Sequence, residues 1–549
     1  DGDHGEEEKD GDLAGEQMPP LLRLVSIKNL LEGVDGGTLL IDIPFDKIGA
    51  LKGISSSVSF IPENLLPKVR KVFAKYLEAC LHDRTAIAEL KLFLLPVVIF
   101  DNVSRKTADL KTAMKVKLLQ LENDDWTSFR VVDMTMRADR RLQTEQEREA
   151  QKNKRVTGLV AQGELSKAYK CLVNDQVEWT ISAAQIYDKL AAKYPQRQED
   201  EQAPDYRRFE VRSEDVPKID VSVEDMSTLI WQLPNAVEPS LDQFRHEHIR
   251  QLFGFKGCDD PSIAEFRRLY TAHINKVANG DVPTDAKALY RDTAAFAGKK
   301  VGSIEEDVRP LGTIALARKI AGKVHAKMQK SFNATHFRDM QYSMDKTGNE
   351  KIIHSTNATL QLNPDKCVFA LDGDNAFMRE ERSMTLKEVK AHFPESLPYM
   401  NMLYGSDSRA WFHGKAEGID HINSQKGLHQ GCTSGTWGYD MGTLPMIREL
   451  QEVIVRLDTE GFAKFSTDDG TLAGSFESLY AGLEYLFSEG PAYGYYLKLS
   501  KGKFLLGKCD SDQVAQDQKQ RLVQLGIQEN NICIHPDNVQ AEGKERAVA

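Results

Sequence analysis

The sequence predicts an α+β protein in which a mostly helical N-terminal half precedes a half with strands between helices. Apolar residues recur at helical spacing over residues 65–81, directly after Pro62. Cys367–Leu371 is an unbroken apolar run, short enough for a buried strand. Apolar residues also flank Asp468-Asp469-Gly470, and Asp-Gly between two such runs is typical of a tight hairpin.

The N-terminal part divides by composition. Residues 1–20 contain eight acidic side chains and one lysine, which predicts a disordered acidic tail. Helical periodicity over 21–195 predicts a helical N-terminal extension, and the polar residues 196–222 are interpreted as a linker. A further helical segment is predicted over 223–286, before a turn and a basic stretch.

Composition excludes several classes of protein. The chain is 41% hydrophobic and 28% charged, as in globular proteins. No run reaches the roughly 18 apolar residues of a membrane span, and no secretory signal opens the chain, so no membrane partner is expected. Seven cysteines without a Cys-x-x-Cys pair argue against a zinc site or a disulfide framework. An intracellular, reducing compartment is expected, nucleus or cytoplasm, with an organelle left open.

Three carboxylates form a candidate metal site. Asp372 ends the apolar run, and a carboxylate there is costly unless it is paired or binds a metal. Asp468 and Asp469 repel each other unless a cation lies between them. A strand-end Asp and a hairpin Asp pair can hold two Mg²⁺ ions about 4 Å apart. Asp124-Asp125 and Asp259-Asp260 also occur, where surface loops are predicted, so the dipeptide alone does not establish a site.

Taken in order, these motifs resemble those of reverse transcriptases, closest to the enzymes of non-LTR retrotransposons. Asp372–Phe377 resembles the first metal motif, an Asp followed by Asn-Ala-Phe, and Asp468-Asp469-Gly470 resembles the second. Between them, Gln430-Gly431 resembles the Gln-Gly turn of the family. Leu499–Lys503 is similar to Leu-Asn-Pro-x-Lys, and Val308–Gly312 is similar to the fingers motif Val-Arg-Pro-Ile-Gly.

The resemblance covers roughly residues 280–510 and implies a right-hand polymerase fold. Fingers are expected over 287–365 and a palm with an antiparallel sheet over 366–510. Residues 511–549 are expected to be a C-terminal tail, with the thumb absent. Ser466-Thr467 precedes the Asp pair, where the family usually has Tyr or Ala.

The resemblance also implies an activity, RNA-directed DNA synthesis, and roles for single residues. Asp372, Asp468 and Asp469 would be catalytic and would bind two Mg²⁺ ions. Phe377 would be the steric gate under the sugar of a dNTP, with a core role as the alternative. Lys503 would be either a general acid to pyrophosphate or a structural lysine. The residues expected to contact the nucleotide are Lys299 or Lys300, Arg309, Asn375, Phe377, Gln430, Gly431 and Lys503.

RNA template and primer are the expected partners, with other ribonucleoprotein subunits as a further expectation. The chain has a net charge of −11, so contact with RNA requires a local basic patch. Residues 287–330 carry ten Lys and Arg against four acids, and the expected contacts there are Arg318, Lys319, Lys323 and Lys327. A merely solvated helix face is the alternative. Two other functions stay open: a catalytically inactive reverse-transcriptase-derived subunit that binds RNA, and an RNA-dependent RNA polymerase.

Overall fold

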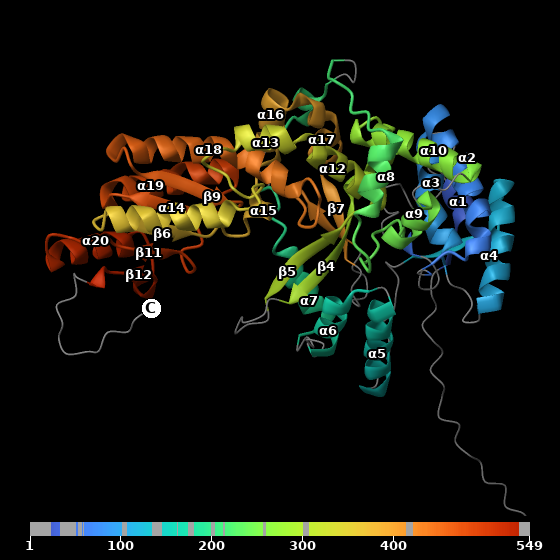
Figure 1. Cartoon of the computed structure of the whole chain (residues 1–549), viewed down its shortest axis with the longest axis horizontal. Coiled ribbons are helices and arrows are strands. Elements are labelled where there is room, and N and C mark those ends of the chain that lie inside the picture. The colour runs from blue at the N-terminus through green and yellow to red at the C-terminus, as the bar shows by residue number, and fades with distance from the viewer. Residues whose placement is uncertain are drawn as a thin grey trace, which may run out of the picture.

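The structure is a computed structural model in which predominantly helical segments surround three sheets (Figure 1). This arrangement confirms the predicted α+β class. The residues that the structure describes are 24–32, 51–52, 58, 60–101, 107–133, 145–161, 163–173, 181–198, 204–211, 215–255, 260–299, 307–412 and 421–536.

One end of the molecule is formed by two groups of helices (Figure 1). The predicted helix after Pro62 is α2, in which Val69, Phe73 and Leu77 recur on one face and are buried. The first group comprises α1 (Ile27–Glu32), α2 (Leu66–His82), α3 (Ala86–Ile99) and α4 (Thr107–Glu122), beside a small sheet of β1 (Leu24–Ser26), β3 (Arg130–Asp133) and β2 (Leu51–Lys52). The second group comprises α8 (Val223–Trp231), α9 (His246–Phe253), α10 (Pro261–Ala278) and α11 (Lys287–Arg291).

A single hydrophobic core joins both helical groups to the C-terminal half. It runs from Ile27 to Leu444 and includes residues of α2, α10 and α12 (Leu316–Met328). The described helices of the predicted extension that belong to this core therefore share it with later segments of the chain.

The segment between the two helical groups also packs against the C-terminal half. It contains α5 (Glu145–Ala161), α6 (Leu165–Val173) and α7 (Ala183–Ala191). After α7, the Gln196 amide donates to the Asn423 carbonyl at 2.9 Å. Phe209 and Ile219 are buried in the main core. The described residues of the predicted linker 196–222 are thus fixed against the protein by packing and hydrogen bonds.

A four-stranded sheet lies at the centre of the molecule, in the order β5-β4-β7-β8 (Figure 1). β4 pairs antiparallel with β5 and parallel with β7, and β7 pairs antiparallel with β8. The strands are β4 (Thr293–Lys299), β5 (Val308–Thr313), β7 (Ser408–Phe412) and β8 (His421–Ser424), and the nearby helices are α12, α13 (Lys330–His336), α16 (Arg382–His392) and α17 (Leu397–Tyr404).

The other end of the molecule holds a five-stranded sheet, in the order β12-β11-β6-β10-β9. It is antiparallel except for β12, which runs parallel to β11. The strands are β6 (Cys367–Leu371), β9 (Phe462–Ser466), β10 (Asp469–Gly474), β11 (Lys503–Leu505) and β12 (Ile532–Cys533), and the helices of this end are α14 (Gly348–Leu362), α15 (Ala376–Arg379), α18 (Gly435–Leu457), α19 (Phe476–Glu489) and α20 (Asp512–Gln524).

The expectation of a C-terminal tail from residue 511 is wrong for its described part, 511–536. Within it, α20 begins at Ser511, whose hydroxyl accepts from the Val514 amide. Leu522 and Ile532 are buried in the core of the five-stranded sheet, and β12 forms its edge. Apolar residues that bury against the sheet hold this segment in place.

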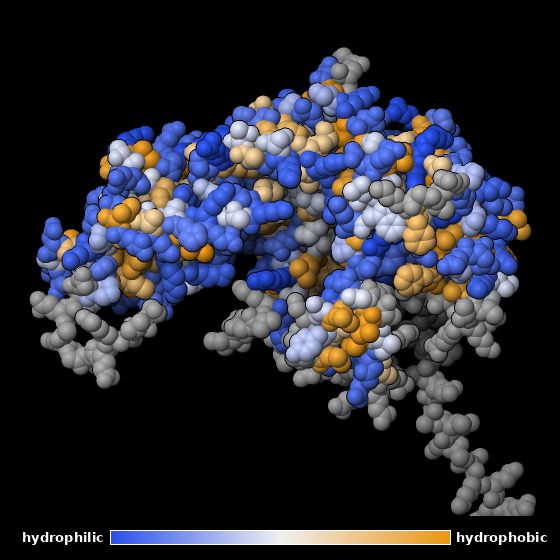
Figure 2. Space-filling model, in the orientation of Figure 1, coloured by the Kyte–Doolittle hydropathy of each residue, from blue (hydrophilic) through white to orange (hydrophobic). Residues whose placement is uncertain are grey.

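The surface drawn in Figure 2 is mostly hydrophilic, with an apolar patch over α5 and α6. The exposed apolar residues of these two helices are Val160, Leu165, Tyr169 and Leu172. Among the described residues, none of the helices combines the length and the apolar character needed to cross a membrane.

Candidate active site

The predicted hairpin is present, but its turn lies two residues earlier than the Asp469-Gly470 dipeptide suggests. Asp469 pairs with Ser466 across β9 and β10, which leaves Thr467 and Asp468 as the two turn residues. Thr467 has a φ of 60°, and Asp468 does not share this left-handed conformation. A positive φ at the first turn position only is typical of a type II′ turn, where glycine is usual.

The hairpin and β6 bring the three aspartates to one end of the sheet. β10 pairs with β6 so that Gly470 lies opposite Leu371, the residue before Asp372. A methyl group built on Gly373 would lie 3.2 Å from Cβ of Asp468, so a side chain here would crowd the turn. Asp372, Asp468 and Asp469 therefore converge, as the sequence predicts.

Burial and neighbouring carboxylates raise the pKa of both hairpin aspartates, Asp468 and Asp469. Burial, then the charges of Asp469 and Asp372, raise the pKa of Asp468 to about 6. Burial and the charge of Asp372 also raise the pKa of Asp469. Lys501 opposes both shifts. Lys501 contacts Asp372, and the charge of Lys498, which pairs with Asp374, also acts on Asp372. A divalent cation would neutralise the negative charge that remains on the three carboxylates.

The lysine that contacts this set is Lys501, which sequence reasoning missed. Its Nζ lies 2.5 Å from Oδ2 of Asp372, an oxygen that makes no hydrogen bond within the described part of the chain. Lys503, which is expected near the nucleotide, lies on β11. Its Nζ instead donates to Oδ1 of Asn531, at a distance of 2.7 Å. The same Leu499–Lys503 motif contains both lysines, so the motif finds the segment and not the residue.

The Val308–Gly312 motif and the Gln430-Gly431 motif contact each other. The Gly312 amide donates to the Gln430 carbonyl at 2.9 Å. Gly431 has a φ of 95°, and a methyl group on it would lie 2.2 Å from the Gly312 carbonyl oxygen. Because no side chain fits at either position, glycine lets β5 approach the turn that precedes α18. The side chain of Gln430 is half-buried at this junction.

Asn375 and Phe377 lie just beyond Asp372. Asn375 has a φ of 52°, and its amide Nδ2 donates to the Lys193 carbonyl at 2.8 Å. Its polar end is therefore engaged by the chain after α7, which does not favour the expected contact with a nucleotide. Phe377 is half-buried and stacks on Tyr439, with ring centroids 4.9 Å apart. Both the gate and the core interpretation of Phe377 agree with this position.

Two of the residues expected to contact the nucleotide, Lys299 and Arg309, lie on the paired strands β4 and β5. Lys299 is the last residue of β4, where it pairs with Val308, and Arg309 is exposed on β5. Lys300 lies outside the described residues.

Arg318 corrects one expectation. Its side chain is 0% exposed, and its guanidinium donates to the carbonyls of Tyr290 (3.1 Å) and Arg291 (2.8 Å) and contacts Nδ1 of His429 at 3.1 Å. The prediction that Arg318 contacts RNA is wrong for this conformation, because its side of α12 faces the core and not the solvent.

The three lysines of α12 are available to RNA to different degrees. Lys319 is half-buried, its Nζ lies 3.5 Å from Nε2 of His246, and burial lowers its pKa. Lys327 is paired with Asp225 at 2.6 Å, and Lys323 is half-buried. The role of these lysines in binding nucleic acid stays a prediction.

The other Asp pairs have local structural partners. Asp125 accepts from the Thr127 amide at 3.0 Å. Asp260 caps α10 by accepting from the Ser262 amide at 2.9 Å. Neither is brought to a strand end as Asp372 is.

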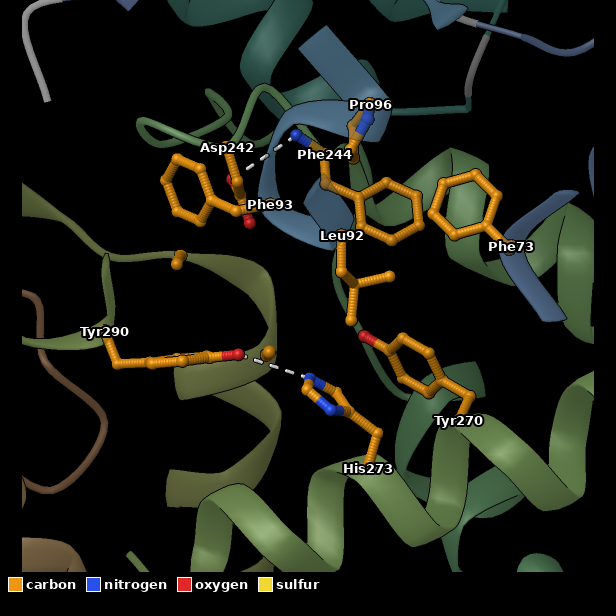
Figure 3. A pocket seen from close by; sticks show the side chains of 11 residues that line it. Phe73, Leu92, Phe93, Pro96, Asp242, Phe244, Tyr270, His273 and Tyr290 are labelled. Carbon is orange, nitrogen blue, oxygen red and sulfur yellow. Dashed lines mark hydrogen bonds between the residues drawn. The ribbon is translucent and has the colours of Figure 1, made fainter. Parts of the chain in front are cut away.

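A second cluster of possible metal ligands lies far from the sheet edge. Potential ligand atoms of Cys80, Glu89 and His273 lie within 4.8 Å of one another. His273 also lines a cavity of about 40 Å³ (Figure 3). Glu89 accepts from Lys276 at 2.8 Å and from the Tyr290 hydroxyl at 2.6 Å. Burial raises the pKa of the Cys80 thiol, which disfavours the thiolate that a metal needs. Lys276 therefore supplies the cation of this buried network.

The carboxylate cluster fits Mg²⁺ better. Its donors are hard oxygens, and Asp468 and Asp469 carry raised pKa values that a bound cation would relieve. No protein-family model and no curated protein matches the chain, so the site is interpreted from its own geometry and from the motifs in the sequence.

Proposed function

We propose that this protein is an RNA-directed DNA polymerase of the retroelement type. The observation that carries the proposal is the convergence of a strand-end Asp372 with the turn residue Asp468 and its neighbour Asp469. In this proposal the five-stranded sheet is the palm and the β4–β5 hairpin belongs to the fingers. The close approach of Gly312 to Gln430 and Gly431 supports it, because it brings two of the motifs that the resemblance assigns to the nucleotide site into direct contact.

The proposed reaction is attack of a primer 3′-hydroxyl on the α-phosphorus of a dNTP, with release of pyrophosphate. Asp372, Asp468 and Asp469 would hold two Mg²⁺ ions, which lower the pKa of the hydroxyl and neutralise charge on the attacking and leaving oxygens. Lys501, now paired with Asp372, is close enough to exchange this partner for a phosphate oxygen. Phe377 would lie under the sugar, held flat by Tyr439.

The experiment that tests this function is primer extension on an RNA template in Mg²⁺, with dNTPs or rNTPs offered separately. Wild type is expected to extend with dNTPs. Extension with rNTPs alone would assign an RNA-dependent RNA polymerase, and extension with neither would favour a non-catalytic RNA-binding subunit.

Sugar choice provides a residue-level prediction. Phe377→Val removes the ring that would collide with a 2′-hydroxyl, so rNTP incorporation should rise by roughly tenfold relative to dNTP incorporation. A competition assay with both nucleotides on one template measures the ratio.

The matched control is Phe393→Val, which shortens a half-buried ring of the same core, packed against Trp437 and away from Phe377 in sequence. It should leave the ratio unchanged. An unchanged ratio in a folded, active Phe377→Val protein would assign Phe377 to the core and remove it from the site.

A further inference from the structure

The short segment Met340–Tyr342, which lies outside the sequence motifs, covers one edge of the five-stranded sheet. β9 is the edge strand of this sheet. The Tyr342 amide donates to the Phe465 carbonyl at 2.7 Å, and the Phe465 amide donates to the Met340 carbonyl at 2.7 Å. Gln341 and Phe465 thus form a parallel bridge, which holds Met340–Tyr342 along the strand that leads to the catalytic turn.

From this position the side chain of Gln341 binds both polar backbone groups of one turn residue. Its Oε1 accepts from the Thr467 amide at 2.9 Å, and its Nε2 donates to the Thr467 carbonyl at 3.1 Å. The side chain is 4% exposed, so water does not compete for these bonds. The Ser343 amide also donates to Oε1 at 3.2 Å, which fixes the orientation of the amide.

Thr467 needs such support. Its φ of 60° is the conformation that glycine adopts freely and that a β-branched residue disfavours. A hairpin turn without a clamp would relax this residue toward negative φ and rotate the next one, Asp468. The direction of the Asp468 carboxylate therefore depends on the conformation of Thr467.

We propose that Gln341 is a positioning residue that holds Thr467 in its left-handed conformation, so that Asp468 faces Asp372 and the pair can bind a divalent cation. The role in metal binding rests on the proposed function. The two hydrogen bonds from Gln341 to Thr467, called the clamp below, do not depend on any ion. It assigns the site a fourth residue, which would touch neither substrate nor metal.

The alternative is that Gln341 only stabilises the sheet, and the chain offers a matched control. Gln451 makes the same kind of clamp at the opposite end of β9: its Oε1 accepts from the Ala463 amide at 2.6 Å, and its Nε2 donates to the Gly461 carbonyl at 3.1 Å. Gln341→Ala removes two bonds to Thr467 and one from the Ser343 amide, and Gln451→Ala removes two bonds at the other end of β9. Only the first variant changes the turn.

The first measurement is the affinity of the protein for Mn²⁺, obtained by electron paramagnetic resonance of the free ion. Only the binding that is lost in Asp468→Asn is counted. Gln341→Ala should weaken this Mn²⁺ affinity about tenfold, which corresponds to about 1.4 kcal/mol. Gln451→Ala should change the affinity by less than about twofold. Adding Thr467→Gly to Gln341→Ala should recover most of the loss, because glycine adopts the turn conformation without a clamp. Equal weakening by both glutamine variants, or no recovery by glycine, would overturn the proposal.

The second measurement does not depend on metal or catalysis. Exchange of the Thr467 amide hydrogen, measured without divalent ions, should be slow in wild type and in Gln451→Ala and faster in Gln341→Ala. If wild type binds no Mn²⁺ through Asp468, the proposed function fails, and the exchange result still decides the clamp. Unchanged protection of Thr467 in Gln341→Ala would overturn the inference whatever the ion result.

Discussion

Asp468→Asn is expected to make the metal-free protein more stable at neutral pH, although it removes a side chain of the proposed active site. Burial and two neighbouring carboxylates raise the pKa of Asp468 from 3.8 to about 6, so its charged form is disfavoured in the folded state. A shift of two pH units corresponds to about 3 kcal/mol, an upper value for the gain when the charge is deleted. We expect about 1–3 kcal/mol, measured by urea unfolding in EDTA.

The pH dependence of this gain has a defined sign. A carboxyl group whose pKa is raised on folding binds more protons in the folded state, so wild type loses stability as pH rises from about 4 to about 6. The asparagine variant lacks this loss, so its advantage should grow between about pH 4 and 6 and level off at higher pH. With Mg²⁺ added, wild type alone should gain stability through this site. A variant that is less stable than wild type in EDTA at pH 7.5 would contradict the repulsion described here.

Arg318→Met is expected to cost about 3 kcal/mol or more, measured by urea unfolding at pH 7.5. Methionine fills part of the space but leaves the carbonyls of Tyr290 and Arg291 without their buried donor, and each unsatisfied group costs roughly 1–3 kcal/mol. If Arg318 served only to contact RNA, replacing it would not lower the free energy of unfolding when RNA is absent.

The control for Arg318 is Lys327→Met on the same helix. Its ion pair with Asp225 is half-exposed, so its loss should change stability by less than about 1 kcal/mol. Similar effects of the two substitutions would contradict the structural role of Arg318.

The sequence predicts the strand and the hairpin that carry the three aspartates, because each has a local signature. Cys367–Leu371 is apolar enough to be a buried strand, and the runs on both sides of Asp468 form β9 and β10. The turn residue could not be predicted from Asp-Gly, because Thr467 adopts the left-handed conformation only with help from Gln341. That help comes from a residue 126 positions away, and no local pattern encodes it.

Burial and register explain the other differences. Arg318 and Lys319 are adjacent and equally basic in sequence, yet one faces the core and the other is only half-buried. Lys501 and Lys503 differ by two positions, and only the local pairing decides that Lys501 reaches Asp372. Main-chain bonds from Lys498 to Asp372 and from Asp374 to Tyr496 set this pairing. Such choices depend on tertiary contacts that neither composition nor spacing contains.

The central claim is that Asp372, Asp468 and Asp469 support nucleotidyl transfer, and Mg²⁺-dependent primer extension on an RNA template tests it most directly. Wild type and Asp125→Asn, which changes an Asp of another pair bonded to Thr127, should extend the primer with dNTPs at similar rates. Asp468→Asn should be slower by roughly a thousandfold, equivalent to about 4 kcal/mol of barrier. Extension by Asp468→Asn at the wild-type rate would contradict the account.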